Sequence, residues 1–339
     1  MNTQAAIQAI QTEQLKNIYL VFGTEKFLQE QIRQAFVKRL KVTTDDLNFA
    51  HFDLEKDSFQ TVLNEAEALP FFGDQRLIFV ERPYFLTAEK KANLVEQDAD
   101  GWLRYFQAPV ESTILVIFAA YDKLDARKKV TKQLKKAAET IDVQPLDEQS
   151  VRRYLQQTMD NDGFAMKRGT FDLFLRLTDV NLSKAMQELQ KIYLFAGEKK
   201  SITEQELTKL IPKTLEHDIF DFTADVLAGN VEDALKIYQD LLLQGEETIK
   251  INAILIGQVR LLLQTKLLMK QGYQQAKIAE TIKVHPYRVK LAMQQVKNYP
   301  ERILIELFDE LVENDYLVKT GKMDKEFLFQ LFVLKTGSR

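Results

Sequence analysis

TILVIF, at residues 113–118, is an almost wholly apolar run with the length of a single β-strand. A strand with one wet face would alternate apolar and polar residues, and this run does not. Continuous apolar strands are typical of parallel sheets that helices cover on both faces. The run therefore predicts a buried parallel strand and an α/β architecture for this part of the chain.

Further strands are predicted on both sides of this run, at residues 18–22, 47–53, 77–81 and 141–143. Helical spacing predicts helices at residues 25–40, 58–69 and 126–139, with Ser58 and Asp125 as expected N-caps of the last two. The carboxylates at residues 98–100 are expected in a solvated loop. Strands that alternate with helices indicate a mostly parallel α/β sheet.

From Pro145 onward no convincing strand pattern is found, and amphipathic helices follow one another. Ile211-Pro212 interrupts the helical spacing and is taken as a domain boundary. We therefore expect a multi-domain protein: an α/β domain at residues 1–145, a small helical domain at 146–212 and a helical domain at 213–339. One core rarely serves a chain of 339 residues, which agrees with this division.

Composition limits the class of protein. The chain has 46 basic and 49 acidic residues and a formal charge of −3, so any contact with nucleic acid must be local. It has no cysteine, which excludes disulfides and thiolate metal sites. No uninterrupted apolar run approaches about 18 residues, and the N-terminus lacks the order of a signal peptide. We expect a cytoplasmic protein without a membrane segment.

The turn after the first predicted strand resembles the start of a nucleotide-binding unit. A phosphate loop needs G-x-x-x-x-G-K-[ST], because its glycines let backbone N–H groups approach the phosphates and its lysine reaches the terminal phosphate. Residues 23–28 read GTEKFL, so the second glycine and the Lys-Ser/Thr pair are absent. Glu25 would also repel a phosphate. We expect no nucleotide cofactor, although an active ATPase remains an alternative.

No catalytic constellation is found in the sequence. His51, His217 and His285 lie far apart, and none belongs to a metal-binding pattern such as H-E-x-x-H. No G-x-S-x-G nucleophile elbow is present. We therefore expect no catalytic residue, no metal and no catalytic activity of the isolated chain.

Residues 69–76, LPFFGDQR, form the most informative loop. Two adjacent aromatics lie between a proline and a Gly-Asp turn, which favours rings held near the surface. The apolar run at residues 77–80 would mount the loop on a buried strand. The alternative is that Phe71 and Phe72 pack into the core beneath the connection, because large apolar residues are mostly buried.

Two other segments have open interpretations. Residues 127–136, RKKVTKQLKK, are basic without an acid, which is typical of a solvated helix face and also suits contact with a phosphate backbone. The lysines concerned are Lys128, Lys129, Lys132, Lys135 and Lys136. The helical segments 274–283 and 286–296 resemble a helix-turn-helix, but the second holds few basic residues and several packing ones. A DNA-binding regulator is thus a further alternative.

Five motifs in order give a family resemblance: IYLVFGTE at 18–25, FFGDQRL at 71–77, GQVRLL at 257–262, VHPYRVK at 284–290 and DYLVKTG at 315–321. With this order and spacing the chain resembles, over its full length, delta subunits of the bacterial DNA polymerase III clamp loader. The resemblance implies a RecA-type, AAA+-like first domain without a working ATP site. It also implies a small helical domain and a C-terminal helical domain that joins a collar with other subunits.

The resemblance further implies partners and a site. Delta subunits open the ring-shaped sliding clamp (beta) by inserting a hydrophobic plug, which corresponds here to Leu69, Phe71 and Phe72. The chain departs from some relatives in having phenylalanine in place of leucine at the first of the two adjacent plug positions, which keeps the apolar character. Implied partners are tau/gamma-type ATPase subunits, delta prime and, in the assembled DNA polymerase III holoenzyme, primer-template DNA.

Overall fold

A computed structural model describes the whole chain except residues 44, 72, 89–93 and 338–339. The chain divides into two compact units. The first comprises Met1–Val151 together with Leu182–Met186, and the second comprises Arg152–Asn181 together with Gln187–Arg339. Each unit is described by itself.

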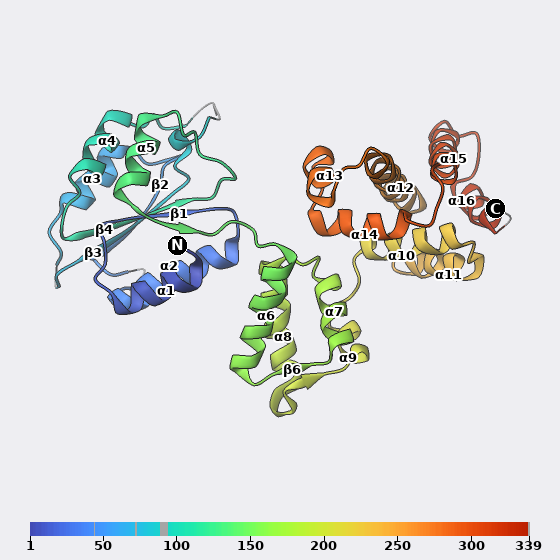
Figure 1. Ribbon diagram of the computed structural model, residues 1–339, viewed down its shortest axis with the longest axis horizontal. Coiled ribbons are helices and arrows are strands. Elements are labelled where there is room, and N and C mark those ends of the chain that lie inside the picture. The colour runs from blue at the N-terminus through green and yellow to red at the C-terminus, as the bar shows by residue number, and fades with distance from the viewer. Residues whose placement is uncertain (44, 72, 89–93, 338–339) are drawn as a thin grey trace. The chain divides into compact units, whose positions relative to one another are not determined.

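The first unit is built on a five-stranded sheet with strand order β2-β3-β4-β1-β5 (Figure 1). All four neighbouring pairs are parallel. The strands are β1 (Ile18–Phe22), β2 (Phe49–Asp53), β3 (Arg76–Glu81), β4 (Thr113–Ala119) and β5 (Glu139–Asp142). The predicted parallel sheet is confirmed, and every residue of β4 is buried, as the apolar run indicated.

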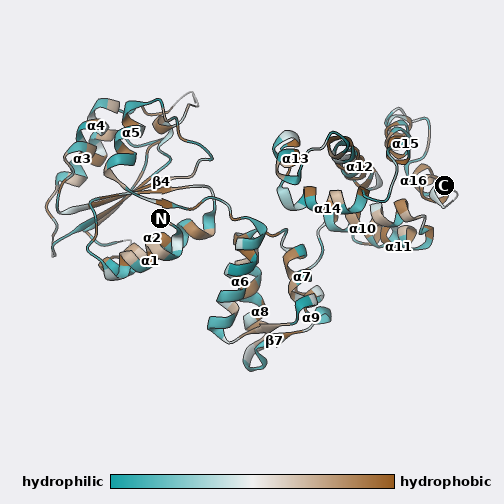
Figure 2. Cartoon of the chain, viewed as in Figure 1, coloured by the Kyte–Doolittle hydropathy of each residue, from teal (hydrophilic) through white to brown (hydrophobic). Residues whose placement is uncertain are grey.

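Helices cover both faces of this sheet. The helices are α1 (Thr3–Thr12), α2 (Lys26–Leu40), α3 (Phe59–Glu67), α4 (Ala99–Gln107) and α5 (Lys129–Ala137), with a 3-10 turn η1 (Tyr84–Leu86). In Figure 1, α1 and α2 lie on one face and α3, α4 and α5 on the other. Figure 2 shows the strands around β4 mostly in brown, whereas the helices carry both colours, as amphipathic helices should.

Strand alternation explains how the two faces differ. Leu20, Leu115 and Ile117 belong to the core under α3, α4 and α5, together with the fully buried Trp102. The intervening residue Tyr19 faces the other way, and its ring meets that of Phe36 in α2 at a centroid distance of 4.8 Å. Because successive strand residues point to opposite faces, one short sequence supplies both cores.

Two expectations about helix ends were wrong. Helix α4 had not been predicted, and Asp98, expected in a solvated loop, is its N-cap: the carboxylate accepts a hydrogen bond of 2.8 Å from the backbone N–H of Gly101. Asp125 is not the N-cap of α5, since that helix starts after Lys128, which makes no side-chain cap. Asp125 instead accepts hydrogen bonds from the backbone N–H and the guanidinium group of Arg127.

The second unit is helical. Its helices are α6 (Glu148–Asp162), which begins in the first unit, α7 (Arg168–Leu177), α8 (Leu182–Ala196), whose first turn belongs to the first unit, α9 (Glu204–Leu210), α10 (Leu215–Ala228), α11 (Val231–Leu243), α12 (Thr248–Lys270), α13 (Gln275–Ile282), α14 (Pro286–Val296), α15 (Glu301–Lys319) and α16 (Lys325–Thr336), with a 3-10 turn η2 (Gly197–Lys199). The expectation of no strand beyond Pro145 was wrong. Strands β6 (Ala165–Met166) and β7 (Ser201–Ile202) pair in parallel, but each is too short to show a periodic pattern.

Helix α12 is the middle of the C-terminal bundle, where it lies against α10, α14, α15 and α16. Leu255, Val259 and Leu262 are all buried and give the helix an apolar stripe. By length and composition alone α12 could cross a membrane, and half of its most apolar window is buried inside the unit. Burial of this kind is also what the core helix of a bundle requires.

Candidate functional site

Loop 68–75 connects α3 to β3 and lies at the end of the sheet where its parallel strands begin. The side chain of Leu69 is 80% exposed and that of Phe71 is 58% exposed. The alternative in which Phe71 packs into the core is therefore wrong, while Phe72 lies outside the described residues. Gly73 has a φ of 144°, a backbone conformation that side chains disfavour. The loop thus presents large apolar side chains from a turn that needs glycine.

Asn48 holds this loop at Phe71 and also holds the start of the strand that follows it. Its side-chain oxygen Oδ1 accepts a hydrogen bond of 2.7 Å from the backbone N–H of Phe71. Its backbone carbonyl accepts one of 2.8 Å from the N–H of Leu77, at the start of β3. Asn48 is only 8% exposed, so water competes little for these bonds.

Arg76, the last residue before the apolar part of β3, connects the loop to α3 and to the turn before β2. Its guanidinium group forms an ion pair with Glu65 in α3 and donates a hydrogen bond of 3.2 Å to the carbonyl oxygen of Leu47. The residue is 3% exposed, and a buried planar guanidinium that bridges a carboxylate and a carbonyl oxygen fixes the geometry of both. The two segments next to the loop are thereby tied together.

Leu47 is an exposed apolar residue that the sequence analysis missed. It had been assigned to a strand at residues 47–53, but β2 begins at Phe49 and Leu47 lies in the preceding turn with 62% of its surface exposed. Its neighbour Asn48 holds Phe71, and its own carbonyl oxygen is held by Arg76. The available signal was a single leucine between two aspartates and an asparagine.

The turn after β1 has a geometry that opposes nucleotide binding. Glu25 is the N-cap of α2 and is buried, and its carboxylate accepts hydrogen bonds from the N–H of Phe27, at 3.4 Å, and from the hydroxyl group of Ser183. A Cβ atom at Gly23 would lie 2.3 Å from the backbone of Val143, so this glycine serves close chain packing. The chain's own carboxylate takes the helix N-terminus, where an anion would otherwise bind.

The basic segment 128–136 holds one lysine bonded to backbone carbonyl groups and four exposed lysines on α5. The amine of Lys128 donates to the carbonyl oxygens of Phe85 and Thr87 at 2.9 and 2.7 Å, which ties α5 to η1. The amine of Lys135 lies 5.7 Å from the ring centre of Phe22, in cation–π geometry. Lys129, Lys132, Lys135 and Lys136 are exposed and could reach a phosphate backbone.

The helix-turn-helix-like pair corresponds to α13 and α14. Its second helix buries Val289, Ala292 and Val296 in the bundle, and His285 serves as its N-cap by accepting from the N–H of Tyr287. A recognition helix needs a free polar face with side chains that reach base edges. Because α14 packs into the bundle through these residues, the structure gives little support to the alternative of a DNA-binding regulator.

The other histidines also have structural roles. His217 forms a capping box with Thr214 at the start of α10, and its Nε2 lies 2.9 Å from the carboxylate of Asp179. His51 lies 3.4 Å from the carboxylate of Glu81. Within the described residues, no group of three or more His, Asp or Glu side chains is arranged to hold a metal ion.

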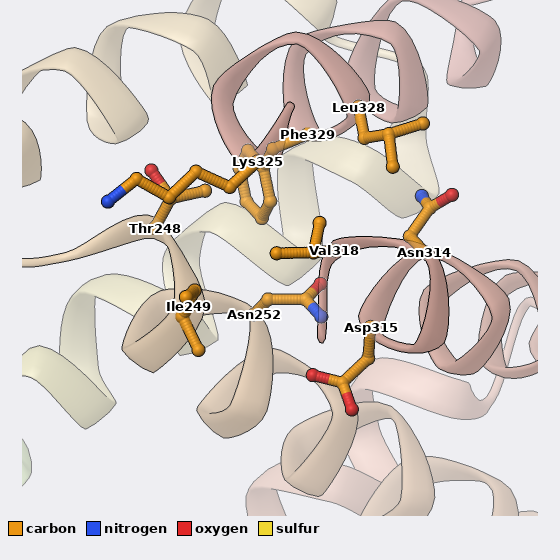
Figure 3. A pocket seen from close by; sticks show the side chains of 9 residues that line it. All are labelled: Thr248, Ile249, Asn252, Asn314, Asp315, Val318, Lys325, Leu328 and Phe329. Atoms are coloured by element: carbon orange, nitrogen blue, oxygen red, sulfur yellow. The ribbon is translucent and has the colours of Figure 1, made fainter. Parts of the chain in front are cut away.

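A second feature is an open pocket between α12, α15 and α16, whose empty space of about 280 Å³ includes open solvent (Figure 3). Its walls mix apolar and polar side chains: Thr248, Ile249, Asn252, Asn314, Asp315, Val318, Lys325, Leu328 and Phe329. Ile249 in its wall is 39% exposed, and two of the helices that form it carry further exposed apolar side chains, Tyr316 at 50% on α15 and Phe327 at 55% on α16. Neighbouring exposed apolar residues of this size are typical of protein interaction surfaces.

Comparisons with known proteins cover nearly the whole chain. The family described as "DNA polymerase III, delta subunit" matches residues 19–144, and "DNA polymerase III delta subunit, C-terminal domain" matches residues 216–336. DNA polymerase III subunit delta of Bacillus subtilis (strain 168) is 37% identical over 326 residues, 95% of this chain and 93% of that protein. The probable DNA polymerase III subunit delta of Aquifex aeolicus (strain VF5) is 19% identical over 79% of this chain and 75% of its own length.

A solved structure is also similar. The Bacillus subtilis DNA clamp loader delta protein matches 99% of this chain and 100% of its own length, with a TM-score of 0.74 and 35% identity. The sheet topology and this match confirm the predicted fold class, an AAA+-like parallel α/β domain followed by helical parts. The resemblance stated from sequence motifs is confirmed as well.

Proposed function

Since this chain belongs to the family of DNA polymerase III delta subunits, whose role is clamp loading in DNA replication, we propose that it binds and opens the sliding clamp through loop 68–75. The observation that carries the proposal is the exposure of Leu69 and Phe71 on a loop whose backbone Asn48 holds at Phe71. Phe72 completes the plug by the family resemblance, and Leu47 extends the apolar surface from the neighbouring turn.

The physical basis is that a few anchored apolar side chains dominate many protein interfaces, each worth roughly 2 kcal/mol or more when it fills a pocket. Loop 68–75 meets the conditions for such an anchor, because the side chains of Leu69 and Phe71 are exposed to solvent while Asn48 holds the backbone at Phe71. Ring opening requires differential binding: the chain must hold the open clamp more tightly than the closed one.

In this proposal the isolated chain hydrolyses no ATP. Glu25 takes the anion position at the N-terminus of α2, and the phosphate-loop glycine and Lys-Ser/Thr pair are missing. The energy of nucleotide binding then comes from tau/gamma-type subunits, which act with delta prime and this chain in a cytoplasmic hetero-oligomer. Their nucleotide state controls when loop 68–75 is available.

Assembly is assigned to the helical domain at residues 213–339, the collar domain of the three-domain division. We name the exposed residues Ile249, Tyr316 and Phe327, together with the pocket formed by the helices that carry them, the collar surface. Exposed apolar side chains on the helices that form a pocket suit a neighbouring subunit better than solvent. In the assembled complex, Lys129, Lys132, Lys135 and Lys136 would contact the primer-template backbone, with Lys128 contributing if it leaves its carbonyl partners.

The direct test uses the full chain and the clamp from the same organism. A clamp labelled with a fluorophore pair across its subunit interface should lose energy transfer when the chain binds, and at the same protein concentration Phe71→Ala should greatly reduce that loss. Phe195, 54% exposed on α8, provides a matched control, because Phe195→Ala removes an equally exposed ring far along the chain. A labelled ring that responds equally to the parent and to Phe71→Ala would contradict the proposal.

A further inference from the structure

Asn48 makes the contacts that give loop 68–75 its shape, although it lies 23 residues before Phe71. Its side chain accepts from the N–H of Phe71, and its carbonyl accepts from the N–H of Leu77. One buried residue therefore holds the backbone of the exposed ring and the first apolar residue of β3 at once.

We propose that Asn48 is a positioning residue that sets loop 68–75 in its clamp-binding conformation before the clamp arrives. The inference rests on the proposed function of the loop and assigns Asn48 no contact with the clamp, since it is only 8% exposed. Its effect on binding passes through the backbone of Phe71.

Asn48 is itself fixed on its other side. Its backbone N–H donates a hydrogen bond of 2.7 Å to the carboxylate of Asp46, and the adjacent carbonyl of Leu47 accepts from Arg76. The acceptor for Phe71 is therefore presented by a turn in which Asp46, Leu47 and Asn48 all take part in hydrogen bonds. A loop supported in this way loses less conformational freedom on binding than a loop that must order itself.

The bond also restricts where the ring of Phe71 can lie. Holding the N–H fixes the peptide plane that precedes Phe71, and the Cα atom that carries the ring lies in that plane. Without the bond, the ring would sample several directions, and only part of the population would be competent to bind. The apparent dissociation constant rises in proportion as that competent fraction falls.

The experiment is a double-mutant cycle with the full chain and the purified clamp. Asn48→Ala should weaken clamp binding about tenfold, which corresponds to a competent fraction of about one tenth. In a Phe71→Ala background the same change should weaken binding less than about twofold, because the residue through which Asn48 acts has lost its ring. Asn48→Asp, which keeps an oxygen acceptor at the same distance along the side chain, should recover most of the affinity.

A readout on the free chain separates positioning from general destabilisation. Hydrogen exchange at the amide of Phe71 should accelerate in Asn48→Ala, while amides in β4 keep their protection. Asn17 supplies the matched control: its side chain donates to the carbonyl oxygens of Val110, Glu111 and Thr113 in the same unit. Asn17→Ala should lower stability without changing exchange at Phe71 or the affinity of the folded protein.

Three outcomes would overturn the inference. Clamp affinity could be unchanged in Asn48→Ala while Phe71→Ala weakens it, or Asn48→Ala could have the same effect in both backgrounds. Either result would leave the proposed function intact and remove the role of Asn48. If Phe71→Ala itself leaves the affinity unchanged, the proposed function of the loop fails first and the positioning role fails with it.

Discussion

The hydroxyl group of Ser183 donates a hydrogen bond to the carboxylate of Glu25, which lies 158 residues earlier in the chain. The same hydroxyl accepts a hydrogen bond of 3.0 Å from the backbone N–H of Phe27. The first turn of α2 is thus satisfied by a carboxylate and a hydroxyl of the chain itself. In a nucleotide-binding protein, such N–H groups would face a phosphate.

From this arrangement we expect no useful binding of ATP or ADP. Isothermal calorimetry of the full chain with Mg-ATP should give a dissociation constant weaker than about 1 mM. Glu25→Ala should not create a site, because the second glycine and the Lys-Ser/Thr pair are still missing. Micromolar binding by the parent that disappears in Lys26→Ala would show that the turn is a working phosphate loop.

Replacing Phe71 and Phe72 together by alanine should reduce clamp affinity about a thousandfold, which corresponds to roughly 4 kcal/mol. The melting temperature should remain near that of the parent, because Phe71 is 58% exposed and adds little to the core. A buried phenylalanine such as Phe106 gives the contrast, since Phe106→Ala should cost about 3 to 5 kcal/mol of stability.

Surface plasmon resonance and thermal unfolding on the same preparations separate these effects. A double variant that melts much earlier than the parent, while its folded fraction binds the clamp normally, would refute the docking role. Phe195→Ala again serves as the control for a ring that is exposed elsewhere.

Tyr316→Ser combined with Phe327→Ser should impair assembly with the other loader subunits. Both side chains are about half exposed on helices α15 and α16, so their replacement removes contact area without creating a buried cavity. We expect at least a tenfold loss of incorporation into the reconstituted complex, with clamp binding by the isolated chain unchanged. Normal incorporation would mean that another surface mediates assembly.

Glu206 should titrate well below an ordinary glutamate. Its pKa is lowered from 4.5 to about 2, first by the hydrogen bond from the Lys199 amine and then by hydrogen bonds from Thr203 in the capping box of α9. Because the folded-state pKa is depressed, the stabilisation is fully present above pH 4.5 and is lost as the pH falls toward about 2.

Carbon-detected NMR on glutamate-labelled protein can measure this titration, with Glu206→Gln used to assign the signal. Lys199→Met should raise the pKa of Glu206 toward 4.5, because it removes the first cause of the shift. A Glu206 signal that titrates near 4.5 in the parent would show that the capping interactions are not formed in solution.

Periodicity sufficed to determine the sheet. β1 and β4 were located from apolar runs because a strand buried on both faces has no polar positions to obscure the pattern. Asp98 and Asp125 show where this reasoning stops. Both are followed by possible first turns, yet Asp98 caps a helix and Asp125 closes a turn with Arg127. Whether such an aspartate caps a helix depends on whether the apolar residues that follow it can pack into a core as a helix.

The sequence by itself determined the parallel α/β class, the mostly helical remainder, the lack of phosphate-loop residues after β1 and, through the order of its motifs, the family. These properties follow from local spacing and residue identity. Only the tertiary structure decided that Phe71 is exposed, that Leu47 lies beside the loop and that Asn48 holds it. The physical reason is that hydrogen bonds across 23 residues depend on how β2 and β3 pair, and that register arises from the whole sheet.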